Sequence, residues 1–184
     1  MHVIFIKKIV IWFSKILSFI FYYSYGLKII KYWGFQGAWW ILNSIWFQKI
    51  LGFNRLAPYP VNPNSRISNY KNLIIPISSM NNLQAPGVYY QNFSAKIILG
   101  ENVFIAPNVG LITANHDLKN PKEHQKGANI EINDNCWIGM NSVLMPGTIL
   151  GKNTIVGAGS VVTKSFEEGN IVIGGVPAKI IKFL

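Results

Sequence analysis

The side chains best suited to chemistry lie where a regular repeat breaks, between Leu111 and Ile132. The insert at the break, Asn115–Asn129, is polar, and its ionisable residues are His116, Asp117, Lys119, Lys122, Glu123, His124 and Lys126. A neutral imidazole can accept a proton at neutral pH, because its unperturbed pKa is about 6.5. His116 is therefore a candidate general base, and Asp117 or a backbone carbonyl group is available to hold its second ring nitrogen.

The composition excludes several other kinds of site. Cys136 is the only cysteine among 184 residues, which excludes a disulfide framework and a cysteine-rich zinc module. We expect Cys136 to be a structural thiol and not a nucleophile. The three histidines, His2, His116 and His124, are far apart or lie beside Lys and Gln residues, so no metal site is predicted. His124 is expected to be solvated or to lie at the rim of a substrate site.

A period of six runs through the second half of the chain. An aliphatic residue opens each of nine units, and Gly or Ala follows it in five of them. The units are Leu99–Phe104, Ile105–Gly110, Leu111–His116, Ile132–Trp137, Ile138–Val143, Leu144–Ile149, Leu150–Ile155, Val156–Val161 and Val162–Glu167.

This period predicts an all-β solenoid, a parallel β-helix. A helix has a period of about 3.6 residues and a half-buried strand a period of about 2, so a period of six fits neither. Short strands joined by tight corners fit it, with three strands in each triangular coil and the aliphatic residues stacked inward. Gly and Asn at the corners tolerate a positive φ. We expect a coil to begin near residues 81–87, after irregular coils over 67–82, and we interpret the stretch from Leu111 to Ile132 as a full coil with a short excursion.

Charge divides the chain into two parts. Residues 1–100 hold 10 basic residues and no acidic residue, whereas residues 101–184 hold 7 of each. We predict a hydrophobic, basic and aromatic helical segment over residues 1–55, and a β-helical domain with a short C-terminal element over residues 56–184. The candidate catalytic loop of this domain is 115–131.

The N-terminal segment suits three environments. The polar positions of Val3–Tyr25 fall on one stripe of a helix at about 100° per residue; they are Lys7, Lys8, Ser14, Lys15, Ser18 and Tyr22. The helix could lie in a membrane interface with lysines at anionic headgroups, or pack on the main domain or a neighbouring subunit. A spanning helix needs about 20 apolar residues, and Lys15 interrupts the run. A secretory signal is disfavoured because the lysines lie inside the apolar run.

The repeat units and four further stretches resemble a known family over residues 85–182. The stretches are Ile112–Asp117, Cys136–Gly139, Val161–Lys164 and Gly174–Lys179. Together they resemble the left-handed parallel β-helix acyltransferases, and within them the sugar O-acetyltransferases that include maltose and galactoside acetyltransferases and enzymes of surface-polysaccharide synthesis. The resemblance implies a left-handed coil, acetyl-CoA as co-substrate, and a homotrimer with its sites between subunits.

The resemblance also implies roles for individual residues. His116 matches the histidine that serves as general base when a sugar hydroxyl attacks acetyl-CoA. The positions that match contacts to acetyl-CoA are Trp137, Met140, Ala158, Thr163, Lys164, Lys179 and Lys182. The asparagine that helps to hold the sugar in maltose-type enzymes has no aligned counterpart. The candidate acceptor contacts are instead Gln84, Tyr89, Gln91, Asn92, Asn115 and Asp117.

The function expected from these observations is acetyl-CoA-dependent O-acetylation of a saccharide, in the synthesis of surface polysaccharide or lipopolysaccharide. The apolar N-terminal segment suggests a lipid-linked acceptor and a cytoplasmic location at the inner face of the membrane. The alternatives are N-acetylation of an amino sugar or a xenobiotic, and a non-catalytic, membrane-anchored scaffold. Nucleic-acid binding is not expected, because the basic half contains only two arginines, Arg55 and Arg66.

Overall fold

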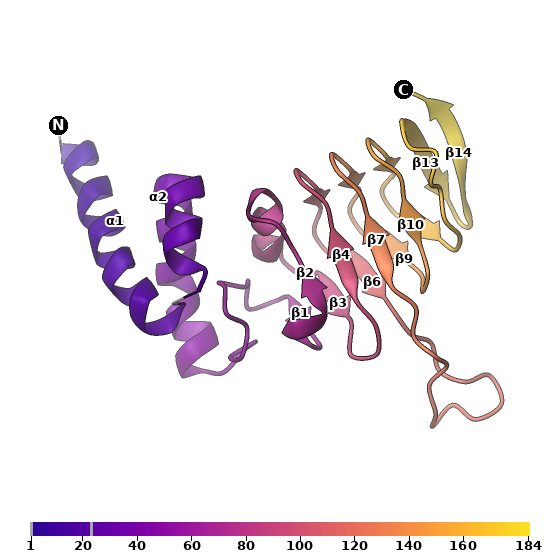
Figure 1. Ribbon diagram of the computed structural model, residues 1–184, viewed down its shortest axis with the longest axis horizontal. Coiled ribbons are helices and arrows are strands. Elements are labelled where there is room, and N and C mark those ends of the chain that lie inside the picture. The colour runs from indigo at the N-terminus through magenta and orange to yellow at the C-terminus, as the bar shows by residue number, and fades with distance from the viewer. Residues whose placement is uncertain (1, 23) are drawn as a thin grey trace. The chain divides into compact units, whose positions relative to one another are not determined.

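A computed structural model describes residues 2–22 and 24–184 of the chain. They form two compact units, Met1–Pro63 and Asn64–Leu184. The first unit is helical, with α1 (His2–Phe21), α2 (Gly26–Ser44) and the π-helical turn η1 (Ile45–Ile50) (Figure 1). Helix α2 is broken at Gly34, whose φ of 57° and ψ of −130° interrupt the helical backbone. Among the described helices, none combines the length and the apolar character needed to cross a bilayer.

The core of the helical unit includes three positions of the predicted polar stripe as well as apolar residues, whereas the lysines of the stripe are exposed. Ser14, Ser18 and Tyr22 are buried, whereas most of the large apolar side chains of α1 are exposed. Gln48 of η1 bonds the chain segment that follows the helices. Its side-chain amide donates to the carbonyl groups of Asn54, Ala57 and Tyr59, at 2.9–3.2 Å. The chain that leaves the helices is therefore fastened to them by a buried amide.

The second unit is the predicted parallel β-helix, built from three sheets that we name A, B and C (Figure 1). Sheet A contains β1 (Arg66–Ile67), β3 (Tyr89–Gln91), β6 (Gly110–Ile112), β9 (Val143–Leu144) and β12 (Val161–Val162). Sheet B contains β2 (Leu73–Ile74), β4 (Ile97–Leu99), β7 (Ile130–Ile132) and β10 (Ile149–Leu150). Sheet C contains β5 (Phe104–Ile105), β8 (Trp137–Ile138), β11 (Ile155–Val156), β13 (Ile171–Gly175) and β14 (Ala178–Phe183).

Two features outside the regular coils complete this unit. Strand β14 pairs antiparallel with β13 and forms the predicted C-terminal element. Two 3₁₀ helices, η2 (Tyr70–Asn72) and η3 (Ile77–Gln84), lie among the first coils, which are irregular as predicted.

The aliphatic residues that open the nine units form the core of the β-helix. Each of them is at most 5 % exposed, which confirms that they point inward: Leu99, Ile105, Leu111, Ile132, Ile138, Leu144, Leu150, Val156 and Val162. The regular coils keep one register, as in the pairing of Glu131 with Ile149, and the Ser165 hydroxyl donates to the carbonyl group of Gly147, 18 residues earlier. Because burial of aliphatic side chains contributes most of the stabilisation of a fold, this column holds successive coils in register.

The length of the excursion was predicted wrongly. Ile97 pairs with Ile130, and beside this pair the Lys96 N–H donates to the side chain of Asn129, 33 residues later. The coil that carries the insert is therefore nearly twice as long as a regular one. Leu111 lies in sheet A and Ile132 lies in the next sheet, B. The stretch between them is one side of a coil plus a long loop, and not a whole coil with a short excursion.

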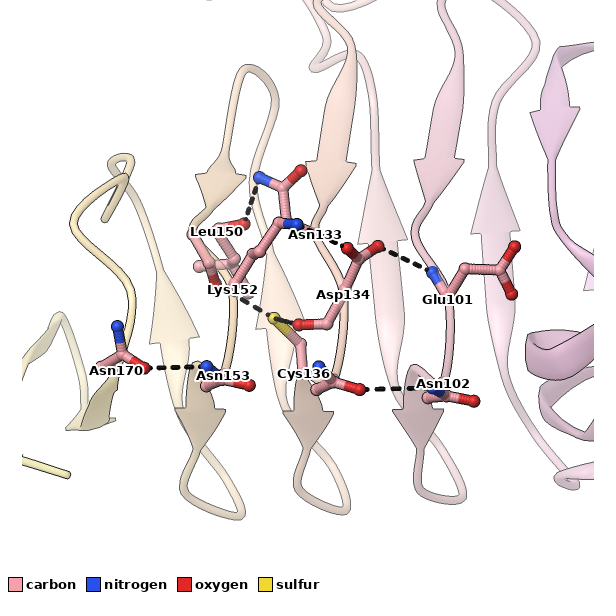
Figure 2. A network of polar contacts seen from close by, with 11 residues as sticks. Glu101, Asn102, Asn133, Asp134, Cys136, Leu150, Lys152, Asn153 and Asn170 are labelled. Carbon is pink, nitrogen blue, oxygen red and sulfur yellow. Dashed lines mark hydrogen bonds and ion pairs between the residues drawn. The ribbon is translucent and has the colours of Figure 1, made fainter.

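Asparagines form the corner between sheets B and C (Figure 2). Asn102, Asn135, Asn153 and Asn170 all have a positive φ, between 51° and 58°. The Asn102 amide donates to Asn135 at 3.3 Å, and that of Asn153 to Asn170 at 2.8 Å. The left-handed corners are thus joined between coils by side-chain hydrogen bonds, which an asparagine can supply and a glycine cannot.

Asp134 links three coils beside this corner (Figure 2). It accepts the backbone N–H of Glu101 at 2.9 Å and pairs with Lys152 at 2.8 Å. The hydrogen bond from Lys152 and that from the Glu101 backbone lower the pKa of the Asp134 carboxyl. Cys136 next to it is buried and donates to the carbonyl group of Gly151 at 3.2 Å. Burial raises the pKa of the Cys136 thiol, which disfavours the thiolate that a nucleophile needs.

The packing of coils predicts different outcomes for two glycines at equivalent positions of successive coils. A Cβ at Gly139 would lie 2.6 Å from the backbone nitrogen of Ala158, whereas a Cβ at Gly157 would meet its nearest atom at 3.5 Å. We expect Gly139→Ala to lower the free energy of unfolding by about 1–3 kcal/mol, a typical cost of overpacking. Gly157→Ala should leave it nearly unchanged. Urea denaturation followed by circular dichroism measures both, and equal effects would contradict the described packing.

Candidate active site

The loop after β6 is a hairpin that projects from the coils, at the lower right of Figure 1. Its two arms are joined by the backbone hydrogen bonds from Asp117 to Glu123 and from Gln125 to Asn115, both of 2.9 Å. The Asp117 carboxylate accepts the backbone N–H groups of Asn120 and Lys119, and these hydrogen bonds lower its pKa. Asp117, predicted to contact the acceptor, thus shapes the tip of the loop.

His116 is exposed near the base of this hairpin, and one of its ring nitrogens has a fixed partner. Nδ1 lies 2.7 Å from the carbonyl oxygen of Pro121. A carbonyl oxygen can only accept, so Nδ1 carries the proton and Nε2 of the neutral ring keeps its lone pair. Of the two partners expected for this histidine, the structure provides the backbone carbonyl and not Asp117. The arrangement suits a base that receives a proton at Nε2.

His124 lies against His116 on the opposite arm of the hairpin. The two rings are 4.4 Å apart between centroids and are tilted by 33°. Phe93, from the coil that precedes the loop, packs its ring against His124 at 5.0 Å and 74°. His124 was expected to be solvated or at the rim of the site; it is exposed, and its ring lies against that of the candidate base. Phe93 was not predicted, because nothing in the spacing of the repeat links it to the loop.

Gln91 holds the start of the loop from the preceding coil. Its Oε1 accepts the backbone N–H groups of Thr113 and Ala114 at 2.9 and 3.1 Å, and its Nε2 donates to the Ala114 carbonyl at 2.8 Å. The Thr113 hydroxyl donates to the Gln91 carbonyl at 2.7 Å. Gln91 is 9 % exposed, so its amide is occupied by the protein's own backbone. It anchors the residues that lead to His116.

The other candidate acceptor residues differ in their access to solvent. Asn92 is buried, and its side chain exchanges two hydrogen bonds with the Asn69 backbone at 2.8 and 2.9 Å. Tyr89 is exposed on the outer face of sheet A, opposite Gly110 of the next coil. Gln84 ends η3, and Asn115 is half-buried beside His116. Of these four, Tyr89 is exposed, Gln84 and Asn115 are half-buried, and Asn92 is buried.

The residues predicted to contact acetyl-CoA occupy several places on the β-helix. Met140 and Ala158 lie one above the other at the corner that leads into sheet A, where the Gly159 N–H donates to the Met140 carbonyl at 2.8 Å. Thr163 and Lys164 directly follow β12, at the carboxyl ends of the strands of sheet A. The loop with His116 leaves sheet A on the same side, after β6. All four are exposed.

The remaining three candidates lie on sheet C. Trp137 is 53 % exposed and pairs in register with Phe104, which is equally exposed. Lys179 and Lys182 are exposed on β14 at the edge of this sheet. In a single chain the seven residues thus flank sheet A and extend over sheet C. Across residues 2–22 and 24–184, no cluster of three His, Cys, Asp or Glu side chains is arranged to hold a metal ion.

Comparison with known proteins identifies the repeat. The model of the family described as bacterial transferase hexapeptide (six repeats) matches residues 129–164. The galactoside O-acetyltransferase of Escherichia coli is 38 % identical over 107 residues, which are 51 % of this chain and 50 % of the relative. That of Lactococcus lactis is 34 % identical over 101 residues, 50 % of this chain and 48 % of the relative.

A solved structure resembles the β-helical unit as well. It is a hexapeptide-repeat-containing acetyltransferase of Vibrio cholerae, with 31 % identity and a TM-score of 0.50 over 54 % of this chain and 57 % of that one. The chain spans about half the length of the curated relatives that it matches. The three sheets of parallel coil strands, the inward aliphatic residues every six positions and these similarities agree. The β-helical unit is therefore similar to the hexapeptide-repeat transferases, and the family model itself matches residues 129–164 of it.

Proposed function

We propose that this protein transfers an acetyl group from acetyl-CoA to a hydroxyl group of a saccharide, with His116 as general base. The observation that carries the proposal is the hydrogen bond from His116 Nδ1 to the Pro121 carbonyl, which leaves Nε2 free to accept a proton. The relatives named as galactoside O-acetyltransferases support both the acetyl donor and a sugar acceptor.

The reaction requires one proton acceptor and no covalent enzyme intermediate. The acceptor oxygen attacks the thioester carbonyl carbon while Nε2 of His116 takes the hydroxyl proton. The carbon–sulfur bond then breaks, and the same proton passes to the sulfur of coenzyme A. The burial of Cys136 agrees with direct transfer. Lys164 lies at the same edge of sheet A as the loop, and Lys179 and Lys182 provide further positive charge for phosphate groups.

We further propose that three chains assemble around three such sites. The exposed aromatic pair Phe104 and Trp137 on sheet C supports this assembly, because exposed aromatic side chains are enriched at protein interfaces. A neighbouring subunit would also bring together the acetyl-CoA contacts that a single chain distributes over sheets A and C.

The acceptor that we propose is a lipid-linked saccharide, as in the synthesis of surface polysaccharide or lipopolysaccharide at the cytoplasmic face of a membrane. The helical unit supports it, because this unit exposes many large apolar side chains and its chain segment, residues 1–63, contains seven basic and no acidic residues. An enzyme held at a membrane surface meets a lipid-linked substrate at a high local concentration.

The first test of the proposed reaction replaces the base. We expect His116→Ala to lower kcat for thiol release from acetyl-CoA by about 100- to 10,000-fold, the usual contribution of a positioned base. Acetyl-CoA binding, measured by calorimetry, should persist because the side chain does not hold the donor. The assay compares soluble sugars, amino sugars and lipid-linked glycans as acceptors. A variant with nearly full activity would refute the catalytic role of His116, and release with amino sugars alone would indicate N-acetylation.

His124 supplies a matched test in the same loop. Because its ring lies against that of His116 at 4.4 Å, we expect His124→Ala to lower kcat about five-fold, by removing a ring contact worth about 1 kcal/mol. His124→Phe should restore most of the rate, because an aromatic ring can keep the stacking without a titratable group. If His124→Phe and His124→Ala lower kcat by the same factor, His124 acts through its nitrogens and not by positioning His116.

A further inference from the structure

The helices of the N-terminal unit turn small and polar side chains toward one another. Ser14 and Ser18 of α1 are fully buried, and Ala38 of α2 is buried beside Ser14. A Cβ added to Gly26 would overlap the Cβ of Ser18. The seam between α1 and α2 is therefore too narrow for large side chains.

The polar groups of this seam find all their partners within the unit. The Ser14 hydroxyl donates to the Val10 carbonyl at 2.7 Å, and that of Ser18 to the Lys15 carbonyl at 2.8 Å. The Tyr22 hydroxyl shares a hydrogen bond of 2.7 Å with Ser44. Burial raises the pKa of Tyr22 to about 12. These hydroxyls therefore need no water to satisfy them, as in helices that pack against each other in lipid.

The opposite face of α1 is apolar and uncovered. Eight large side chains on it are 44–64 % exposed: Phe5, Ile6, Ile9, Trp12, Phe13, Ile16, Phe19 and Ile20. At about 100° per residue they cover an arc of about 140° that runs the whole length of the helix. Soluble proteins rarely expose an apolar surface of this extent unless it binds a partner or a membrane. We name it the outer face of α1.

Lysines border the outer face. Lys8 lies four residues before Trp12 and Lys15 four before Phe19, so each ammonium group lies one helical turn from an outer-face ring. Residues 1–63 carry seven basic residues and no acidic one. A second copy of this unit would therefore bring only like charge to the contact, whereas an anionic lipid surface brings the opposite charge.

We propose that α1 lies parallel to the surface of an anionic lipid leaflet, with its outer face at the boundary of the hydrocarbon. Lys8 and Lys15 reach the phosphate groups, and the serine seam faces away from the lipid. This inference deepens the membrane placement of the proposed function. It differs from the sequence-based picture of an amphipathic helix in one respect: the serines of the polar stripe face α2, and only its lysines meet headgroups.

The test is co-sedimentation of the full chain with vesicles of phosphatidylcholine, with or without phosphatidylglycerol. We expect binding to the anionic vesicles that survives a wash at about 1 M NaCl. At this salt concentration the Debye length is about 3 Å, so attraction between charges is largely screened and apolar contact must hold the protein. Ile9→Glu places a charge at the centre of the outer face and should lower the bound fraction at least ten-fold. Gln36→Glu adds the same charge at an exposed position of α2 and should bind like the wild type.

Each other outcome would overturn the proposal. Complete release by salt would mean that charge alone holds the protein on the vesicles. An equal decrease of the bound fraction in both variants would mean that net charge, and not the outer face, determines vesicle binding. If Ile9→Glu instead abolishes self-association in analytical ultracentrifugation and no chain binds vesicles, the outer face is a contact between copies. Thiol release with a soluble sugar is measured on the same samples, so failure of membrane insertion is distinguished from failure of the catalytic proposal.

Discussion

The register between successive coils is the constraint on which the rest of the β-helical unit depends. Each unit of the repeat contributes one inward aliphatic residue, and the parallel pairing of each strand with the strand of the preceding coil fixes its register. Leu111 pairs with Leu144, which pairs in turn with Val162. A corner residue therefore repeats in space whenever it repeats in sequence, and Met140 lies below Ala158 for this reason. A shift of one residue would turn the aliphatic column outward and expose it to water.

The same register explains how the coil tolerates a long inserted loop. The strands on both sides of the insertion keep their partners, since Phe104 pairs with Trp137 and Ile97 with Ile130 across it. The loop is then held at its base and along its arms, by Gln91 below and by the backbone bonds between its arms. The exposed tip is ordered by its own hydrogen bonds, since the Asp117 carboxylate accepts the backbone N–H groups of Lys119 and Asn120.

The fold could be predicted from sequence because the period of six assigns one inward position to each unit. The site could be predicted only in part. The stretch between Leu111 and Ile132 fits either a long coil or a short side with a long loop, and only strand pairing decides between them. The contact of Gln91 with the loop joins coils of irregular length, so no repeat aligns the two. The stacking of His124 on His116 depends on the hairpin, which has no sequence period.

The helical unit shows a similar limit. Helical periodicity located the stripe of polar positions in α1, but a stripe does not reveal what it faces. The buried hydroxyls of Ser14 and Ser18 became recognisable as a helix–helix seam only when Gly26 and Ala38 were seen opposite them. Small residues at such positions carry little hydrophobic signal, because they contribute by their size and not by their polarity.

Strand β14 carries two exposed lysines, Lys179 and Lys182, at the edge of sheet C. It is the last strand of sheet C, and it would otherwise present an open row of backbone groups beside exposed Ile181, Phe183 and Leu184. Such edges recruit strands from other molecules, and charged side chains on them prevent it. Lys179 and Lys182 are therefore suited to prevent a neighbouring molecule from adding a strand to this sheet. Substitution of these lysines would affect solubility along with any contact to a nucleotide. The charged last strand of the solenoid would in this way disfavour the end-to-end association that leads to fibres.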